Sequence, residues 1–337
     1  MSEKPPVRYL PASFADLPGW AGADPRAALS AFRLGCKAQR PAAAPLPVGA
    51  AALGDGLAAA CRAAAASGAT DADGARAFFE AHFAPWRVEG PGGAEGLFTG
   101  YYEPTLEAAR TRRPGFDTPI YALPAEARPG AVLSARADIE NGAPKGWRVL
   151  FWARDPVDVF TLHVQGSGRL ALAEGGFARV SYAGNNGRGY VAIGRLMRER
   201  GLLPEGGTNM PAIQAWLRAN PGPGRALMQE NPRYIFFREV PAGEGPKGQP
   251  GVALTPLASL AVDPAFIPLG LPLWLDTTWP LETGKELRTL VVAQDTGAAI
   301  KGPVRGDVFF GSDGDAARNA GHMAQRGRYY LLLPKAK

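Results

Sequence analysis

The 337-residue sequence predicts a mostly β protein with a helical N-terminal segment. Three observations lead to this prediction. Residues 1–90 are rich in alanine and carry helix-capping residues, which favour packed helices. From about residue 97 the sequence changes to short apolar runs separated by glycine-rich turns. A final block, residues 234–333, holds several strand-like runs and one helical segment, a pattern typical of a small barrel.

The N-terminal segment is expected to form three helices. Asp24 is a helix N-cap residue, and Pro25 after it suits the first helical turn, so a helix should extend from there to about Lys37. Pro85 should end the third helix. The other expected parts are a Pro/Ala linker over residues 41–47 and helices over residues 57–66 and 71–84.

The middle of the chain is expected to be rich in strands. The run 157–165 alternates between two sets of residues that are both partly apolar, which predicts a strand covered on both faces. Glycine and proline positions predict where the helices end. Other expected strands are 97–104, 149–153, 234–240, 273–276, 290–294, 308–310 and 329–333; the expected helices are 190–200, 211–219 and 315–325; and residues 243–251 are expected to be a flexible loop.

Composition and motifs exclude several classes of protein. The net charge of +6 suits an anionic partner in general, but no run of five Lys/Arg and no aromatic RNA-binding signature occurs, so nucleic acid is not expected. The sequence has no phosphate-binding loop, no GxSxG elbow, no CxxC and no HxxxH pair. We therefore expect no metal and no other cofactor. No apolar run of about 18 residues is present to span a membrane.

The only two cysteines, Cys36 and Cys61, allow two interpretations. They could close a loop of about 25 residues, which would stabilise the fold by about 3 kcal/mol in the chain-entropy model. They could equally be two unpaired thiols in helix cores.

Two aspartates twelve residues apart are the strongest candidates for chemistry. Asp295 follows a continuous apolar run and precedes a Thr-Gly turn, and Asp307 opens the apolar strand expected next. A carboxyl group against apolar strands has a raised pKa, which suits a general acid. The alternatives are a turn-capping role for Asp295 and an ordinary strand-edge charge for Asp307, and the pattern alone does not dismiss them.

Five ordered motifs over about residues 97–333 resemble the membrane-bound lytic murein transglycosylase A family. The segment from Asp295-Thr296-Gly297 through Ile300-Lys301-Gly302 to Asp307 is similar to that family's catalytic segment. The other matching segments are Thr99-Gly100-Tyr101-Tyr102-Glu103-Pro104, Val164-Gln165-Gly166-Ser167-Gly168, Tyr182-Ala183-Gly184-Asn185-Asn186-Gly187, and Pro256 to Asp263 with the Pro268-Leu269-Gly270 turn.

The resemblance implies a particular fold. Residues 1–103 and 240–337 are expected to form a catalytic double-psi β-barrel domain with N-terminal helices. Residues 104–239 are expected to form an inserted β-rich, substrate-binding domain, with a glycan groove between the two. Because relatives are cell-envelope proteins, the resemblance also favours a Cys36–Cys61 disulfide, since disulfides persist in oxidising compartments.

The resemblance further implies cleavage of peptidoglycan without water. Asp307 would be the single acid and base, and Asp295 a second catalytic or electrostatic group. The expected substrate-binding residues are Thr99, Gly100, Tyr101, Gln165, Gly166, Ser167, Lys301 and Arg305. A non-catalytic wall-binding barrel protein and a hydrolysing glycosidase are the alternatives.

The resemblance also implies partners and a location. The expected partners are glycan strands and proteins of cell-wall synthesis or turnover, and the expected state is a monomer. The expected location is the periplasm or the outer membrane of a Gram-negative bacterium, with any signal peptide or lipid anchor absent from this chain.

Overall fold

A computed structural model describes residues 7–38, 46–142, 145–204, 207–241, 245–312 and 314–335. The chain divides into two compact units. The barrel unit holds the residues up to Tyr101 together with 247–311 and 322–337, and the inserted unit holds residues 102–246 and 312–321. Residues 312–321 therefore belong to the inserted unit, although the sequence had placed them with the C-terminal block of the barrel.

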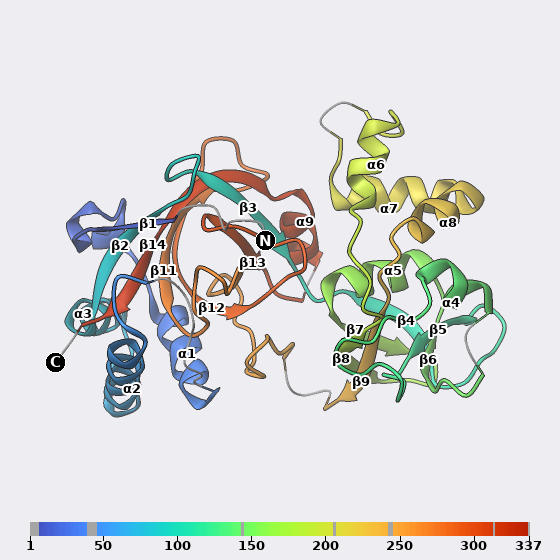
Figure 1. The fold of residues 1–337 in the computed structure, drawn as a ribbon, viewed down its shortest axis with the longest axis horizontal. Helices are drawn as coiled ribbons and strands as arrows, with labels where there is room; N and C mark the ends of the chain where they lie inside the picture. Colours follow the sequence, from blue (N-terminus) through green and yellow to red (C-terminus); the bar gives the residue numbers. More distant parts are fainter. Residues whose placement is uncertain are drawn as a thin grey trace. The chain divides into compact units, whose positions relative to one another are not determined.

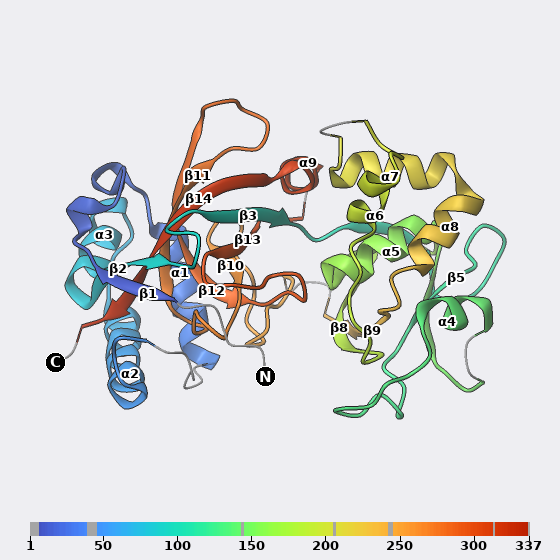
Figure 2. The same ribbon diagram turned by 45° about the horizontal axis from the view of Figure 1, so that its top comes forward.

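Six strands of the barrel unit close into a ring (Figures 1 and 2). Their order is β14, β11, β12, β10, β13 and β3, and β3 pairs back to β14. Two neighbouring pairs, β3 with β13 and β10 with β12, are parallel, and the rest are antiparallel. The ring strands are β3 (Gly96–Tyr101), β10 (Ser259–Val262), β11 (Pro272–Thr278), β12 (Glu286–Asp295), β13 (Arg305–Phe309) and β14 (Ala324–Pro334).

Two further strands, β1 (Arg8–Pro11) and β2 (Phe83–Glu89), extend the sheet outward from β14. The sequence had predicted a helix up to Pro85, and this was wrong because the helix ends at His82 and Phe83 is already extended. Pro85 lies inside β2, where its carbonyl accepts a hydrogen bond from the Ala12 N–H at 3.0 Å. A proline lacks only the donor, so its presence did not exclude a strand.

Three helices pack on the barrel unit, α1 (Arg26–Gly35), α2 (Ala50–Ala66) and α3 (Ala72–His82). The first packs against β12 and the second against β14. A disulfide joins Cys36 to Cys61 with a Cα–Cα distance of 5.6 Å, which confirms that prediction. The predicted linker 41–47 lies largely outside the described residues, as does part of the 243–251 loop. The described part of the same unit also has short 3-10 helices at Phe14–Asp16, Trp20–Gly22 and Cys36–Ala38.

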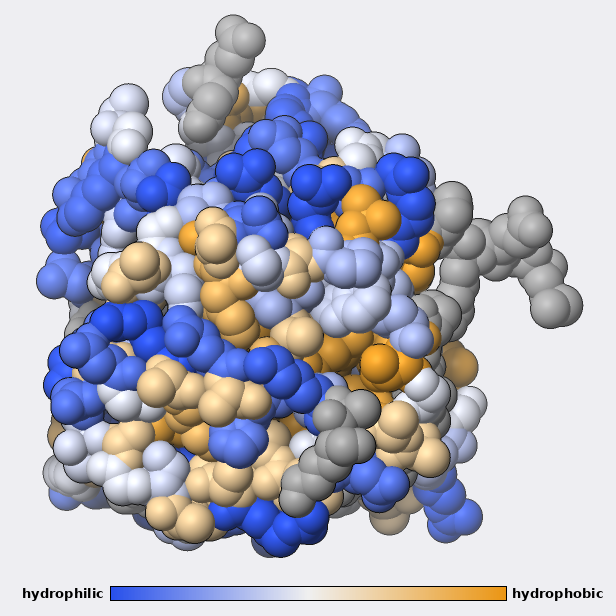
Figure 3. Space-filling view, turned by 90° about the vertical axis from the view of Figure 1, so that its left-hand side faces the viewer, coloured by the Kyte–Doolittle hydropathy of each residue, from blue (hydrophilic) through white to orange (hydrophobic). Residues whose placement is uncertain are grey.

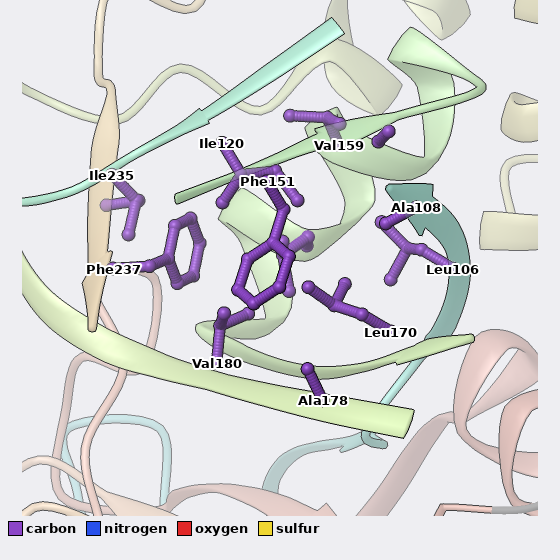
Figure 4. Close-up of a cluster of buried hydrophobic side chains, with 12 residues drawn as sticks. Leu106, Ala108, Ile120, Phe151, Val159, Leu170, Ala178, Val180, Ile235 and Phe237 are labelled. Carbon is purple, nitrogen blue, oxygen red and sulfur yellow. The ribbon is translucent and has the colours of Figure 1, made fainter. Parts of the chain in front are cut away.

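The inserted unit is built on a six-stranded sheet in the order β5-β6-β4-β7-β8-β9. A helix, α5 (Pro156–Gln165), contributes Val159 and Leu162 to a core with the apolar side chains of the sheet, among them Phe151 and Phe237 (Figure 4). The strands are β4 (Thr105–Ala109), β5 (Thr118–Tyr121), β6 (Val149–Ala153), β7 (Ser167–Leu172), β8 (Phe177–Asn185) and β9 (Ile235–Val240).

The prediction of a strand over residues 157–165 was wrong. Asp155 caps the helix by accepting from the Val157 N–H at 2.8 Å, Pro156 occupies the first turn, and Gly166 ends the helix in the left-handed conformation at φ 80°. From Val157 to His163, every side chain except that of Asp158 is buried, so nearly every side of this helix is covered. A helix buried all round carries no helical period, so its apolar residues also fitted a strand covered on both faces.

The other helices of the inserted unit lie outside this core. The helices α6 and α7 occur where the sequence predicted them, whereas α8 begins at Pro221 immediately after α7 and was not predicted. Their bounds are α4 (Arg136–Gly142), α6 (Ile193–Glu199), α7 (Met210–Ala219), α8 (Pro221–Gln229) and α9 (Gly314–His322).

The surface mixes polar and apolar residues. On the face seen in Figure 3, hydrophobic residues form areas bounded by hydrophilic ones. Among the described helices, none combines the length and the apolar character that crossing a bilayer requires.

Candidate active site

Four neighbouring strands of the barrel bring the two aspartates and a threonine into one row. Asp307 pairs with Thr99 on β3 and with Ala261 on β10, and Ala261 pairs in turn with Asp295 on β12. Residues paired across a sheet point to the same face, so the side chains of Asp295, Asp307 and Thr99 share a face. The same face carries a buried cluster of Tyr101, Leu254, Ala261, Ile300 and Phe309.

Asp307 lies in the middle of β13 rather than at its start as predicted, because the strand begins two residues earlier at Arg305. Its side chain is half-buried. The Thr99 hydroxyl donates to Asp307 Oδ1 at 2.6 Å, and no described residue of the barrel unit donates to Oδ2. Burial raises the pKa of Asp307, while the Arg305 charge and the Thr99 hydrogen bond act in the opposite direction. A raised pKa favours the protonated form that a general acid needs.

Arg305 holds Thr99 in place. Its Nη2 donates to Thr99 Oγ1 at 2.8 Å, so the hydroxyl accepts from Arg305 and donates to Asp307. Its Nη1 donates to the Leu97 carbonyl at 3.3 Å and also to the Gly306 carbonyl. Burial lowers the pKa of Arg305. These bonds compete with the contact to a substrate carboxylate that the sequence predicted for this residue.

Asp295 is the last residue of β12, and three donors hold its carboxyl group. Oδ1 accepts from the Thr296 N–H at 2.9 Å and the Gln249 N–H at 3.1 Å, and Oδ2 lies 3.1 Å from the donating Tyr101 hydroxyl. Burial raises the pKa of Asp295 to about 6 despite these bonds, and the Asp307 charge adds to the rise. The pKa of Tyr101 is also raised, first by burial and then by the two carboxylates.

The role of Gln249 was not predicted, because its backbone N–H is what contacts Asp295. The sequence signal is the neighbouring glycine. A Cβ atom at Gly248 would lie 2.0 Å from the Gln294 carbonyl oxygen, so only glycine allows the loop to approach the end of β12 this closely.

The remaining predicted residues are not members of this row. Gly100 pairs with Val308 inside the parallel β3–β13 pair, and Lys301 is exposed between β12 and β13. Gln165, Gly166 and Ser167 belong to the inserted unit, at the junction of α5 and β7. There the Gln165 Oε1 accepts from the Tyr102 N–H at 3.1 Å, and Ser167 pairs with Ser181.

No group of three or more His, Cys, Asp or Glu side chains within the described ranges is arranged to hold a metal ion. The chemistry available in the barrel unit is that of two half-buried carboxyl groups in different hydrogen-bonding environments. Among the described residues of the barrel unit, both oxygens of Asp295 accept hydrogen bonds, whereas Oδ2 of Asp307 accepts none.

Two segments of the chain match the models of known domain families. Residues 97–238 match the model of the MltA specific insert domain, and residues 258–333 match the model of the 3D domain. These matches define the class as proteins in which a 3D domain accompanies this insert. The chain is 35% identical over 256 residues to membrane-bound lytic murein transglycosylase A of Escherichia coli K12, an alignment that covers 73% of this chain and 68% of that protein. The chain belongs to the membrane-bound lytic murein transglycosylase A family.

A second relative of the same name, from Vibrio cholerae, is 34% identical over 247 residues, which are 70% of this chain and 65% of that protein. The aligned part thus spans slightly less than two thirds of the Vibrio protein.

Solved structures of related proteins have the same fold. A membrane-bound lytic murein transglycosylase from Agrobacterium tumefaciens superimposes with a TM-score of 0.86 at 33% identity, covering 97% of both chains. The lytic transglycosylase LtgG of Burkholderia pseudomallei has a TM-score of 0.65 at 42% identity, covering 99% of this chain and 97% of that one. E. coli MltA with bound chitohexaose has a TM-score of 0.73 at 27% identity, covering 99% and 95%.

Proposed function

We propose that this protein is a lytic transglycosylase of peptidoglycan. It cleaves the bond between N-acetylmuramic acid and N-acetylglucosamine and leaves a 1,6-anhydro-N-acetylmuramic acid end. The proposal depends on the state of Asp307, a half-buried carboxyl group with a raised pKa and one oxygen that accepts no hydrogen bond from the described barrel residues. The named relatives and the chitohexaose complex of E. coli MltA support a β-1,4-linked glycan as the substrate.

One carboxyl group suffices for this reaction because the substrate supplies the nucleophile. Protonated Asp307 gives its proton to the glycosidic oxygen as the C1–O4 bond breaks. The C6 hydroxyl of the same muramic acid then bonds to C1, and its proton passes to the Asp307 carboxylate. An intramolecular attack of this kind has a high effective molarity. No water is consumed, and the enzyme returns to its starting protonation state.

Asp295 serves this reaction as an electrostatic or structural group. Its three hydrogen bonds leave it poorly placed to exchange a proton with substrate. In its ionised form, its negative charge favours the positive charge that develops at C1 in an oxocarbenium-like transition state.

The substrate-binding roles are part of the same proposal. In the barrel unit, the substrate is bound by Tyr101, Gly100 and Thr99, and the Thr99 hydroxyl also donates to Asp307. In the inserted unit, the substrate is bound by Gln165, Gly166 and Ser167. The lactyl or peptide carboxylates of the substrate are bound by Lys301 and Arg305.

The same proposal covers the topological class of the barrel and the cellular location of the protein. We assign the six-stranded ring to the double-psi class, which the two parallel strand pairs β3–β13 and β10–β12 support. The periplasm or outer membrane is the proposed location. The relatives' name, membrane-bound, and the Cys36–Cys61 disulfide support it.

Mass spectrometry of digested sacculi tests the function directly. A lytic transglycosylase releases anhydro-muropeptides, whereas a hydrolase releases products with a reducing end that are heavier by one water. A wall-binding barrel protein that does not cut would bind sacculi and release neither product. Either of these last two results would overturn the proposal.

A further inference from the structure

A buried ion pair in the inserted unit includes Glu103, which follows β3, the strand of Thr99, in the chain. Glu103 is 1% exposed, and Arg179 on β8 is 8% exposed. The two form a bidentate pair, with Arg179 Nε 2.8 Å from Glu103 Oε1 and Nη2 donating to Oε2 at 2.9 Å. The Ser312 hydroxyl donates to the same Oε2 at 2.8 Å. One carboxylate therefore joins three segments of the chain.

Two of these segments are the direct continuations of β3 and β13. Glu103 follows the last residue of β3 by two positions, and Ser312 follows the last residue of β13 by three. Between the strand ends and these residues, the Phe310 N–H donates to the Tyr101 carbonyl at 2.9 Å. The Ser312–Glu103 hydrogen bond thus links the segments that follow β3 and β13, after the Phe310–Tyr101 backbone bond.

An ion pair at this buried position is best explained by the geometry that it imposes. Two charges lose their hydration when they are buried, and an apolar pair of similar volume could hold the segments together without that cost. A bidentate Arg–carboxylate pair fixes direction as well as distance. Such fixed geometry matters where a hydrogen bond of 2.6 Å, from Thr99 to Asp307, links the same two strands.

We propose that Glu103, Arg179 and Ser312 form a positioning clamp that keeps the ends of β3 and β13 in register and so keeps the Thr99–Asp307 hydrogen bond in place. The clamp residues touch no reacting atom. They act through the two strands, and the inference rests on the proposed role of Asp307.

The test measures kcat and KM on soluble peptidoglycan glycan fragments, with thermal unfolding alongside. Glu103→Gln should lower kcat by about 10- to 100-fold, the scale of loss that a misplaced catalytic group produces, with KM changed less than about twofold. Ser312→Ala leaves the ion pair intact and should lower kcat by a smaller factor, about 3- to 10-fold. Ser312→Thr keeps the hydroxyl and should restore kcat.

The matched control is another arginine–carboxylate pair of the same unit. Arg136 is 1% exposed and pairs with Glu140 at 3.0 Å, and neither residue adjoins β3 or β13 in the chain. Glu140→Gln should lower the melting temperature and leave the kcat of the folded enzyme unchanged. Wild-type kcat in both Glu103→Gln and Ser312→Ala, or a loss no larger than that of Glu140→Gln, would overturn the clamp. Absence of anhydro product from the wild-type enzyme would instead overturn the proposed function.

Discussion

At the scale of single residues, the two aspartates differ in what holds them. Within the described part of the chain, Asp295 accepts from three donors, two of them backbone N–H groups, whereas Asp307 accepts from the Thr99 hydroxyl. The sequence indicated both carboxylates and ranked them through the family resemblance. It did not indicate Gln249, since a backbone donor 46 residues away in the chain leaves no side-chain pattern.

Asp307→Asn should abolish turnover while glycan binding persists. Loss of a general acid costs about 10²–10⁴-fold, and because the same group also acts as the base, the loss should lie at or beyond the upper end. Asparagine keeps the size of the side chain and can still accept from Thr99. Release of anhydro-muropeptides from sacculi and a binding assay measure the two effects, with Asp295→Asn as the milder comparison. Near-wild-type release of anhydro-muropeptides by Asp307→Asn would show that Asp307 is not the catalytic acid and base.

Thr99→Val should move the pH dependence of the reaction. The Thr99 hydrogen bond lowers the pKa of Asp307, so its loss should raise that pKa. The reaction begins with protonated Asp307, and kcat falls as pH rises through its pKa. The falling limb of the kcat–pH profile should therefore shift to higher pH in Thr99→Val and stay in place in Thr99→Ser. Arg305, Asp295 and Tyr101, the other charged or titratable groups nearby, are present in both variants, and Thr99→Val also removes the acceptor of Arg305 Nη2. A shift to lower pH would contradict this role for Thr99.

At the scale of elements, the sequence predicted α6, α7 and β9 close to where they occur and did not predict the strands β4, β5, β7, β8 and β10. It failed at α5, where both faces are buried and the alternation of Val157, Val159 and Thr161 resembled a strand. The Asp155-Pro156 cap and Gly166 were helix signals of the same kind that indicated α1, and they were the better evidence. Propensity and caps are local, so they remain informative when periodicity is lost.

Strand pairing could not be predicted from local pattern in the same way. The β3–β13 pair joins residues more than 200 positions apart, as the Thr99–Asp307 separation of 208 shows. Only the family resemblance linked these two segments before the structure did. The register that aligns Thr99, Asp307, Ala261 and Asp295 is a property of the closed ring.

Gly96→Ala should destabilise the barrel at this pairing. A Cβ atom at Gly96 would lie 1.7 Å from the Val304 carbonyl oxygen, so β3 would have to move away from the chain entering β13. Overpacking of this kind costs about 1–3 kcal/mol or more. Urea unfolding measures the loss, and Gly92→Ala is the control because nothing lies within 4 Å of its Cβ position. The control should stay within about 0.5 kcal/mol of wild type. Equal stability of the two variants would mean that the strands are not packed this closely.

At the scale of the whole molecule, buried ionisable groups connect function to stability. Burial raises the pKa of Asp307 and Asp295, and it lowers the pKa of His163, whose ring nitrogen lies 3.0 Å from the Arg136 guanidinium. A histidine with a lowered folded pKa contributes stability above its unfolded value of about 6.5 and loses it as pH falls below that value. The carboxyl groups have the opposite dependence.

Asp307→Asn should therefore raise the melting temperature at pH 7 while it abolishes turnover. The pKa of this carboxyl is higher in the folded than in the unfolded protein. At neutral pH the unfolded state ionises freely, whereas the folded state must either bury the charge or keep the proton, so the free energy of unfolding is lower. The cost disappears below the ordinary value of 3.8, where the group is protonated in both states. The stability gain of the variant should shrink as pH falls from 7 towards 4. Differential scanning calorimetry of wild type and variant at each pH measures it, and the His163 contribution cancels because both proteins share it. A variant less stable than wild type at pH 7, with a gap that does not change with pH, would show that Asp307 carries no such cost.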